Sequence, residues 1–235
     1  MRIITVFLLS LFSCSAVWAQ DEKEQKQNIE KDSYEAYDER PYPATNVPVS
    51  EQAADFIALF QESDVGNLRL YAHPDDELPY GYPFAGDEIP EDFYSMFTGE
   101  YRELLEDDLA YAYSVYSIKG NEGQHYIMRL PTDKGPNTLV LFDLQGEVMV
   151  PVQVLAFAYC QEGYCYQQDS FITDLDGDTD LDVLVKFERS LPESEEVVNK
   201  NDIMFLQQDN GEYRMVLDNP IEVDPGMYNM KEVNF

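Results

Sequence analysis

The sequence predicts an α+β fold that is mainly antiparallel β, with short N-terminal helices followed by hairpin-connected sheets. The first observation is order, because helix-like apolar spacing ends before Leu109 and apolar or alternating runs follow it. The second is the set of glycine-containing turns between these runs, which favour hairpins and antiparallel pairing. The third is composition, since 44% hydrophobic and 13% aromatic residues suffice for a core. We therefore expect one β-rich domain over residues 49–235.

Residues 1–19 have the three parts of a signal peptide. Met1-Arg2 supplies positive charge, the apolar run Ile3–Phe12 follows, and small residues end the stretch. The run is shorter than the roughly 20 residues of a membrane-spanning helix. Val17-Trp18-Ala19 suits removal by a signal peptidase, whereas Leu11-Phe12-Ser13-Cys14 resembles a lipobox, which would make Cys14 a lipid anchor. Both alternatives predict an extracytoplasmic protein: periplasmic, an outer-membrane lipoprotein, or secreted.

An acidic linker is expected over residues 20–48, between the leader and the domain. The stretch is rich in Gln, Glu, Lys, Asp and Pro, and it has few large aliphatic residues. A segment of this composition buries too little apolar surface to fold, so we predict that it is disordered.

Two short helices are predicted at the start of the domain. The first follows Ser50, which is a typical N-cap residue. Its apolar face consists of Phe56, Leu59 and Phe60. The second, Glu91–Phe97, follows Pro90, and proline is favoured where a helix begins. A short strand, Asn67–Tyr71, is predicted between them.

A series of strands is predicted after Leu109, each an apolar or alternating run of suitable length. They are Tyr111–Tyr116, His125–Leu130, Thr138–Leu144, Val148–Tyr159, Tyr164–Thr173, Asp182–Phe187, Ile203–Gln207 and Glu212–Leu217. Turn signals lie at Gly120–Gly123, Gln145-Gly146, Glu162-Gly163 and Asp209–Gly211.

Cys160 and Cys165 are expected to form a disulfide. Cys14 is either removed with the leader or lipidated, which leaves an even number of cysteines in an exported chain. The intervening Gln161–Tyr164 suits a hairpin turn that would bring the two sulfurs within bonding range. A metal site of this spacing needs two further ligands, and the neighbouring sequence offers none.

Carboxylates alternate along one passage of the chain. They are Asp174, Asp176, Asp178, Asp180 and Asp182. In a plain strand these charges would repel one another along one face, whereas Ca²⁺ takes six to eight oxygen ligands and would explain them. Gly177 allows a tight backbone turn around an ion. The passage is not an EF-hand, because Thr179 and Val185 stand where that loop has Gly and Glu.

This passage resembles the calcium loops of FG-GAP/VCBS repeats, which carry Asp-x-Asp-Gly-Asp-Gly-x-x-Asp between two strands. The resemblance covers about residues 170–217, one blade-like unit, and departs at Thr179, where the repeat often has glycine. It implies side-chain ligands from Asp174, Asp176, Asp178 and Asp182, and a backbone carbonyl ligand from Asp180. With a single such loop, the chain more loosely resembles the compact half-propellers found among periplasmic lysozyme inhibitors.

A second motif, Ala72–Glu77, resembles the opening of the PIG-L/LmbE zinc-dependent deacetylases. It implies zinc ligands at His73 and Asp76 and a base at Asp75. That family continues with a glycine-rich turn and further histidines on a parallel sheet, whereas this chain has only His125 downstream. A catalytic zinc needs three protein ligands, so a zinc-dependent hydrolase is kept as the alternative.

The formal net charge of −31, from 46 acidic and 15 basic residues, bears on the partner. Such a chain has no basic footprint for nucleic acid, and it favours a basic protein or a divalent cation. The acidic and aromatic segment 71–108 has two interpretations. It is a binding face for such a partner, or Phe93, Phe97 and Tyr101 are core residues among solvated acids.

We therefore expect a non-enzymatic, exported calcium-binding protein. It would act as a binding or inhibitory, immunity-like module for a basic protein partner, with the calcium in a structural role. The sequence contains two histidines and lacks G-x-S-x-G and glycine-rich phosphate loops, so neither a serine triad nor nucleotide binding is supported. A surface-adhesion or structural role is a further alternative.

Overall fold

The computed structural model describes residues 50–63, 67–106, 110–120, 123–192, 196–208, 211–216, 227–233 and 235. They belong to one unit, which spans Ala44–Phe235. The predicted leader with Cys14 and the predicted linker 20–48 lie outside the described residues. Within the described ranges, no helix has the length and apolar character that crossing a membrane requires.

The fold is mostly antiparallel β-sheet, with 52% of the described residues in strands and 13% in helices, so the prediction of a mainly antiparallel β structure is confirmed. The strands are β1 Gln61–Ser63, β2 Leu68–Leu70, β3 Asp87–Glu88, β4 Tyr113–Lys119, β5 Gln124–Thr132, β6 Gly135–Gln145, β7 Val148–Gln161, β8 Tyr164–Thr173, β9 Asp182–Ser190, β10 Val197–Gln207 and β11 Tyr213–Val216. They form one open sheet in the order β1-β4-β5-β6-β7-β8-β9-β10-β11, with β2 on β8 and β3 on β4. Only the β1–β4 pair among these strands is parallel.

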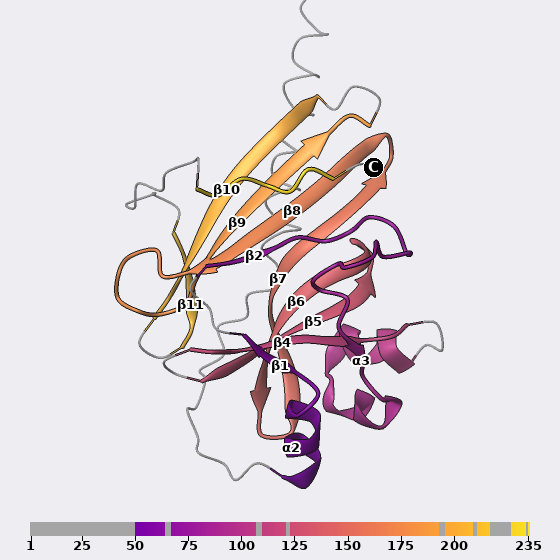
Figure 1. Ribbon diagram of the computed structural model, residues 1–235, viewed down its shortest axis with the longest axis vertical. Coiled ribbons are helices and arrows are strands. Elements are labelled where there is room, and N and C mark those ends of the chain that lie inside the picture. The colour runs from indigo at the N-terminus through magenta and orange to yellow at the C-terminus, as the bar shows by residue number, and fades with distance from the viewer. Residues whose placement is uncertain are drawn as a thin grey trace, which may run out of the picture. The chain divides into compact units, whose positions relative to one another are not determined.

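The long strand β7 connects two halves of this sheet (Figure 1). Its first part pairs with β6 up to Ala156, and its last part, from Phe157, pairs with β8. Register shifts interrupt the β6–β7 pairing beside Pro151, where a proline is tolerated because a ladder hydrogen bond is already lost. We call β4–β6 the first half and β8–β11 the second half.

The helices are short and begin where local signals place them. Helix α2, Glu51–Ile57, is capped by Ser50, whose Oγ accepts a 3.2 Å hydrogen bond from the N–H of Ala53. The stretch after Pro90 is a 3₁₀-helix, η1 Glu91–Met96, rather than an α-helix. A further helix, α3 Gly99–Glu106, was not predicted, because its buried residues are only Tyr101 and Leu105 among many acids.

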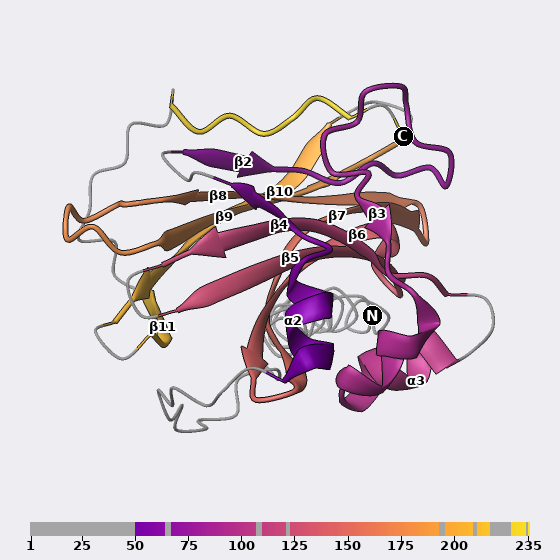
Figure 2. The ribbon, with the colours of Figure 1, turned by 60° about the horizontal axis from the view of Figure 1, so that its bottom comes forward.

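The three helices cover one face of the first half (Figure 2). The rings of Phe97 and Tyr101 pack edge-on against Phe142 of β6, with centroids 5.8 and 5.2 Å away. Phe97 and Tyr101 are 1% and 6% exposed, and Phe93 is partly buried against the same cluster. The core interpretation of these aromatic residues is therefore confirmed.

The second half covers the other face of the first half. One continuous cluster joins Ile127 and Leu141 of the first half with Val183, Val185 and Phe205 of the second. Strands β5 and β6 are thus buried on both faces, which explains their near-continuous apolar runs. The first half of the sheet therefore lies between the layer of helices on one side and the second half of the sheet on the other.

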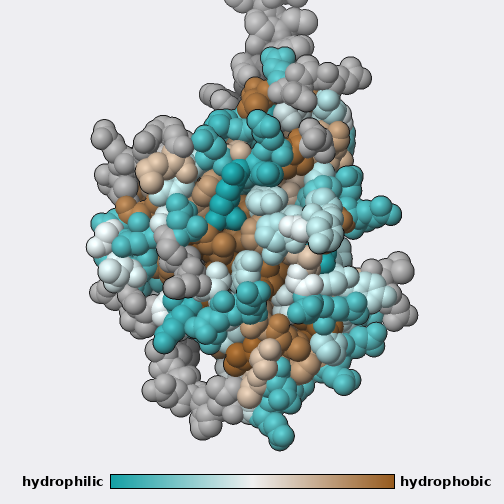
Figure 3. All heavy atoms as spheres, viewed as in Figure 1, coloured by the Kyte–Doolittle hydropathy of each residue, from teal (hydrophilic) through white to brown (hydrophobic). Residues whose placement is uncertain are grey.

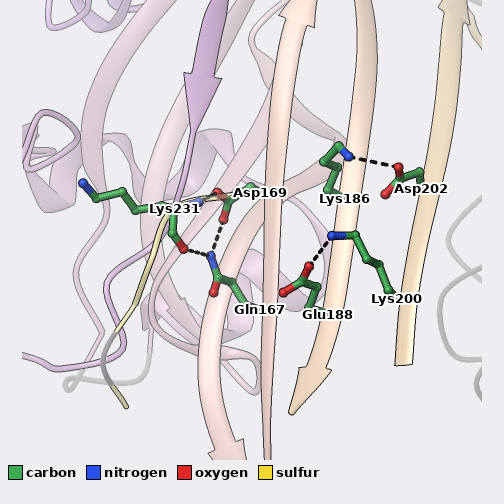
Figure 4. A network of polar contacts seen from close by, with 7 residues as sticks. All are labelled: Gln167, Asp169, Lys186, Glu188, Lys200, Asp202 and Lys231. Carbon is green, nitrogen blue, oxygen red and sulfur yellow. Dashed lines mark hydrogen bonds and ion pairs between the residues drawn. The ribbon is translucent and has the colours of Figure 1, made fainter. Parts of the chain in front are cut away.

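The C-terminal segment 227–233 crosses the outer face of the second half, where Tyr228 packs in a small apolar cluster with Phe171, Leu184 and Met204 (Figure 1). Hydrophilic residues gather there near β9 and β10 (Figure 3). Two ion pairs join residues that face each other in register, Lys186 with Asp202 at 3.0 Å and Lys200 with Glu188 at 2.6 Å (Figure 4).

The β7–β8 hairpin turns at Glu162 and Gly163, as the sequence predicts. Both residues have positive φ, 53° and 81°, which matches a type I′ turn. The turn places Cys160 directly opposite Cys165, with Cα atoms 4.0 Å apart, and a disulfide joins them.

Candidate metal centre

The aspartate-rich loop lies between two strands of the second half. Strand β8 ends at Thr173, and β9 begins at Asp182, its register partner. The loop 174–181 is therefore closed at its base by an antiparallel pair of strands. An EF-hand loop lies between helices, so the structure agrees with the prediction that this loop is not an EF-hand.

Three of the five predicted carboxylates converge. One oxygen each from Asp174, Asp176 and Asp182 lies within 4.8 Å of the others, the one such group of possible metal ligands in the part of the chain that the structure describes. Two oxygens on opposite sides of one Ca²⁺ ion would lie about 5 Å apart, so the spacing fits a shared ion. The side chains of Asp178 and Asp180 are not part of this group.

Backbone N–H groups wrap around the carboxylates of the loop. Asp174 accepts hydrogen bonds from Gly177 at 2.7 Å and from Thr179 at 3.1 Å. Asp176 and Asp178 each accept one from the residue two positions on, at 3.2 and 2.9 Å. These bonds hold the turn in shape and aim the carboxylates.

Two loop residues have the left-handed backbone conformation. Gly177 has φ +86° and Thr179 has φ +77°. Glycine adopts this conformation at no steric cost, whereas a β-branched threonine is strained there. Thr179 is the position at which the sequence departs from the FG-GAP/VCBS pattern, so the departure falls on a backbone conformation that favours glycine.

Asp182 is the buried member of the group, with no exposed surface. Its Oδ2 accepts from the N–H of Leu175 at 2.7 Å, and its Oδ1 accepts from the N–H of Gln207 at 3.0 Å. Burial raises the pKa of Asp182 to about 6, and the negative charges of Asp176 and Asp178 raise it further. The two backbone hydrogen bonds have the opposite effect and lower this pKa. Burial and neighbouring carboxylates also raise the pKa of Asp176. A cation bound among these carboxylates would favour their ionised forms and would lower the pKa values of both Asp176 and Asp182.

Sequence reasoning missed Gln207, a further residue that holds the loop. Gln207 ends β10 and is 2% exposed. Besides its bond to Asp182, its side-chain Oε1 accepts from the N–H of Leu181 at 3.2 Å. The signal in the sequence is slight, a polar residue at the end of a predicted strand, and the pairing of β10 with β9 brings it to the loop.

The motif at Ala72–Glu77 has a different environment. The N–H of Asp75 donates to Nδ1 of His73 at 3.2 Å, and Asn137 donates to the carbonyls of both residues. Asp75 and Asp76 are exposed. Among the described residues, His73 joins no group of three possible metal ligands. The structure therefore places this motif in a loop that Asn137 fastens to β6.

The metal centre is supported by the spacing of the aspartates in the sequence and by the convergence of three of them in the structure. The chain matches no protein family model, no curated protein and no solved structure. The resemblance of residues 170–217 to FG-GAP/VCBS repeats and the identity of the ion stay predictions.

Proposed function

We propose that the protein is an exported, calcium-stabilised binding module for a basic protein partner, in an inhibitory or immunity-like role. The observation that carries the calcium assignment is the convergence of Asp174, Asp176 and Asp182 within one β-flanked loop. All donor atoms of this group are carboxylate oxygens, which suit hard cations. Loop carbonyls and water would complete the six to eight ligands that Ca²⁺ takes.

A structural role for the ion follows from what the loop joins. Its carboxylates come from the connection between β8 and β9, and Gln207 attaches the same loop to the end of β10. An ion bound only by the folded state stabilises it by about 2.7 kcal/mol when calcium is in hundredfold excess over Kd. Affinities of about 10⁻⁴–10⁻³ M are typical of extracellular calcium modules.

We further propose that β8–β11 form a blade-like unit around the ion. These strands make a four-stranded antiparallel meander, the strand number of a propeller blade, and the loop connects its first two strands. This arrangement supports the FG-GAP/VCBS interpretation. We extend the same proposal to the whole domain, as an α+β fold that is half-propeller-like.

The proposal of a basic partner is supported by where the acids lie. The helical layer presents exposed carboxylates on α2, η1 and α3: Glu51, Asp55, Glu91, Asp92, Glu100 and Glu103. The aromatic side chains Phe97 and Tyr101 point into the core instead. Acidic surfaces of this kind accelerate association with basic partners and make it sensitive to salt.

Two measurements test these proposals separately. For the ion, thermal unfolding is followed with a chelator, with calcium and with magnesium; a calcium-specific rise in Tm is expected, and no shift would overturn the assignment. For the partner, the chain is used to capture proteins from cell envelope at low and high salt. Specific capture of a basic protein that salt releases is expected, and capture of none at low salt contradicts the proposal.

A further inference from the structure

A chain of buried hydrogen bonds leads away from the candidate metal loop into the first half of the sheet. His125 of β5 is 5% exposed and lies directly opposite Asp143 of β6 in register. Its Nδ1 lies 2.5 Å from Oδ1 of Asp143, and its Nε2 lies 3.1 Å from Nε2 of Gln207. Gln207 in turn bonds Leu181 and Asp182. The chain thus connects Asp143 on one half with the loop on the other.

The N–H of Leu181 determines which atom donates and which accepts in each hydrogen bond of this chain. The N–H of Leu181 can only donate, so the Gln207 side chain turns its Oε1 toward it. The Gln207 Nε2 then faces His125 and donates to a ring nitrogen that carries no proton. The ring proton therefore sits on Nδ1 and is donated to Asp143.

We propose that His125 is a protonation switch that sets the conformation of the 174–182 loop through Gln207. A proton on Nε2 makes it a donor that faces the amide nitrogen of Gln207, which is also a donor. If the amide turns over to offer Oε1 to the ring, its nitrogen then faces the N–H of Leu181. Either arrangement loses one buried hydrogen bond, so protonation loosens the attachment of the loop to β10.

Side chains from neighbouring strands surround His125. Asp143 on β6 pairs with the protonated ring, and the ring of Tyr213 on β11 lies 6.0 Å from it. On β4 the register partner is the uncharged Ile118, and a Cβ on Gly120 would lie 3.5 Å from both the ring and the Gln207 side chain. Histidine is the side chain that normally changes charge between pH 5 and 8.

The experiment follows hydrogen exchange of the Leu181 amide in the full chain, with a chelator present, from pH 8 to pH 5.5. The protection factor, which removes the intrinsic effect of pH, should fall about three- to tenfold on acidification, the effect of one buried hydrogen bond. His125→Gln is the matched variant, because its amide oxygen accepts from Gln207 but does not titrate. Asp182, with a pKa raised to about 6, titrates in both proteins, so the difference between them isolates His125.

A second variant inverts the expected sign. In Gln207→Glu, a carboxylate accepts from Leu181 and also from a protonated His125, so Leu181 protection should rise as the pH falls. The proposal is overturned if the protection of Leu181 depends on pH equally in the wild type and in His125→Gln. It is also overturned if protection in Gln207→Glu falls on acidification, as in the wild type. If His125→Gln does not fold, the Gln207→Glu comparison decides alone.

The consequence for calcium rests on the proposed function. Because the loop is attached less firmly when His125 is protonated, calcium affinity should fall more steeply with acidification in the wild type than in His125→Gln. Isothermal titration with calcium at pH 7.5 and pH 6 measures this difference. Absence of calcium binding at both pH values would defeat the metal assignment, while the exchange data, taken without metal, still decide the switch.

Discussion

The backbone N–H of Lys231 donates a 2.6 Å hydrogen bond to Oδ2 of Asp169, which ties the C-terminal segment to the outer face of β8. Gln167 completes the attachment by donating to the carbonyl of Lys231 at 2.8 Å (Figure 4). Three residues earlier, Tyr228 packs edge-on against Phe171, with ring centroids 5.2 Å apart. The segment is therefore part of the folded layer rather than an appendage.

Asp169→Ala is expected to detach this segment. Asp169 has no exposed surface, and its removal leaves the N–H of Lys231 without its acceptor and takes away one of the two acceptors of the Gln167 side chain. A loss of about 1–3 kcal/mol in the free energy of unfolding is expected, with faster exchange of the Lys231 amide. Urea denaturation and hydrogen exchange measure the two effects.

Glu188→Ala is the control on the same face. Its partner Lys200 is exposed, and pairs of this kind contribute about 0–1 kcal/mol. Equal losses in the two variants would contradict a special role for Asp169.

Asp176→Asn is expected to abolish the calcium-induced rise in Tm. The substitution keeps an oxygen that accepts from the N–H of Asp178 but removes a charge from the converging group. Differential scanning calorimetry with calcium and with a chelator measures the shift for each variant.

Asp178→Asn makes the same charge change in the same loop, on a side chain outside that group. It should retain most of the calcium response of the wild type. Equal loss in both variants would show that the ion also needs Asp178, as the FG-GAP/VCBS resemblance implies, and not only the three converging carboxylates.

Thr179→Gly is expected to stabilise the metal-free protein. Thr179 has φ +77°, and a non-glycine residue held in this region costs about 1–3 kcal/mol, part of which glycine recovers. Urea denaturation in the presence of a chelator should show a gain of about 1 kcal/mol.

The comparison for this variant is Glu162→Gly, at the other described non-glycine residue with positive φ. Glutamate is not β-branched, so the gain there should be smaller. A loss of stability in Thr179→Gly would mean that the threonine side chain contributes more than its backbone strain costs.

Stability is expected to fall as the pH rises above about 10, where tyrosine ionises in unfolded chains. Burial raises the pKa of Tyr126 to about 12, and it also raises the pKa values of Tyr82 and Tyr101. Above pH 10 the unfolded chain loses these protons while the folded protein keeps them, so unfolding becomes more favourable. Each unit of raised pKa corresponds to about 1.4 kcal/mol, so Tyr126 alone accounts for up to roughly 3 kcal/mol.

Tyr126→Phe removes one titrating group and should flatten this alkaline decline. Urea denaturation between pH 8.5 and pH 11.5 gives the slope for the wild type and the variant. Identical slopes would show that Tyr126 ionises as readily in the folded protein as in the unfolded one.

Local features of the fold were predicted where the physical cause is local. Strand β8 has its predicted bounds, Tyr164–Thr173, because turn residues border an apolar run. The Ser50 cap is likewise a contact between residues three positions apart. Strands β1 and β3 were not predicted, since runs of two or three residues have no measurable periodicity.

For the candidate site, too, the features with a local cause were predicted and those that depend on tertiary contacts were not. The sequence by itself determined the composition of the loop, its β flanks and the glycine at position 177, because these depend on neighbouring residues. Tertiary structure decided which carboxylates converge, and it brought Gln207 and His125 to the loop. Those contacts arise only when β10 pairs with β9 and the two halves of the sheet pack together, which burial of both faces of β5 and β6 makes favourable.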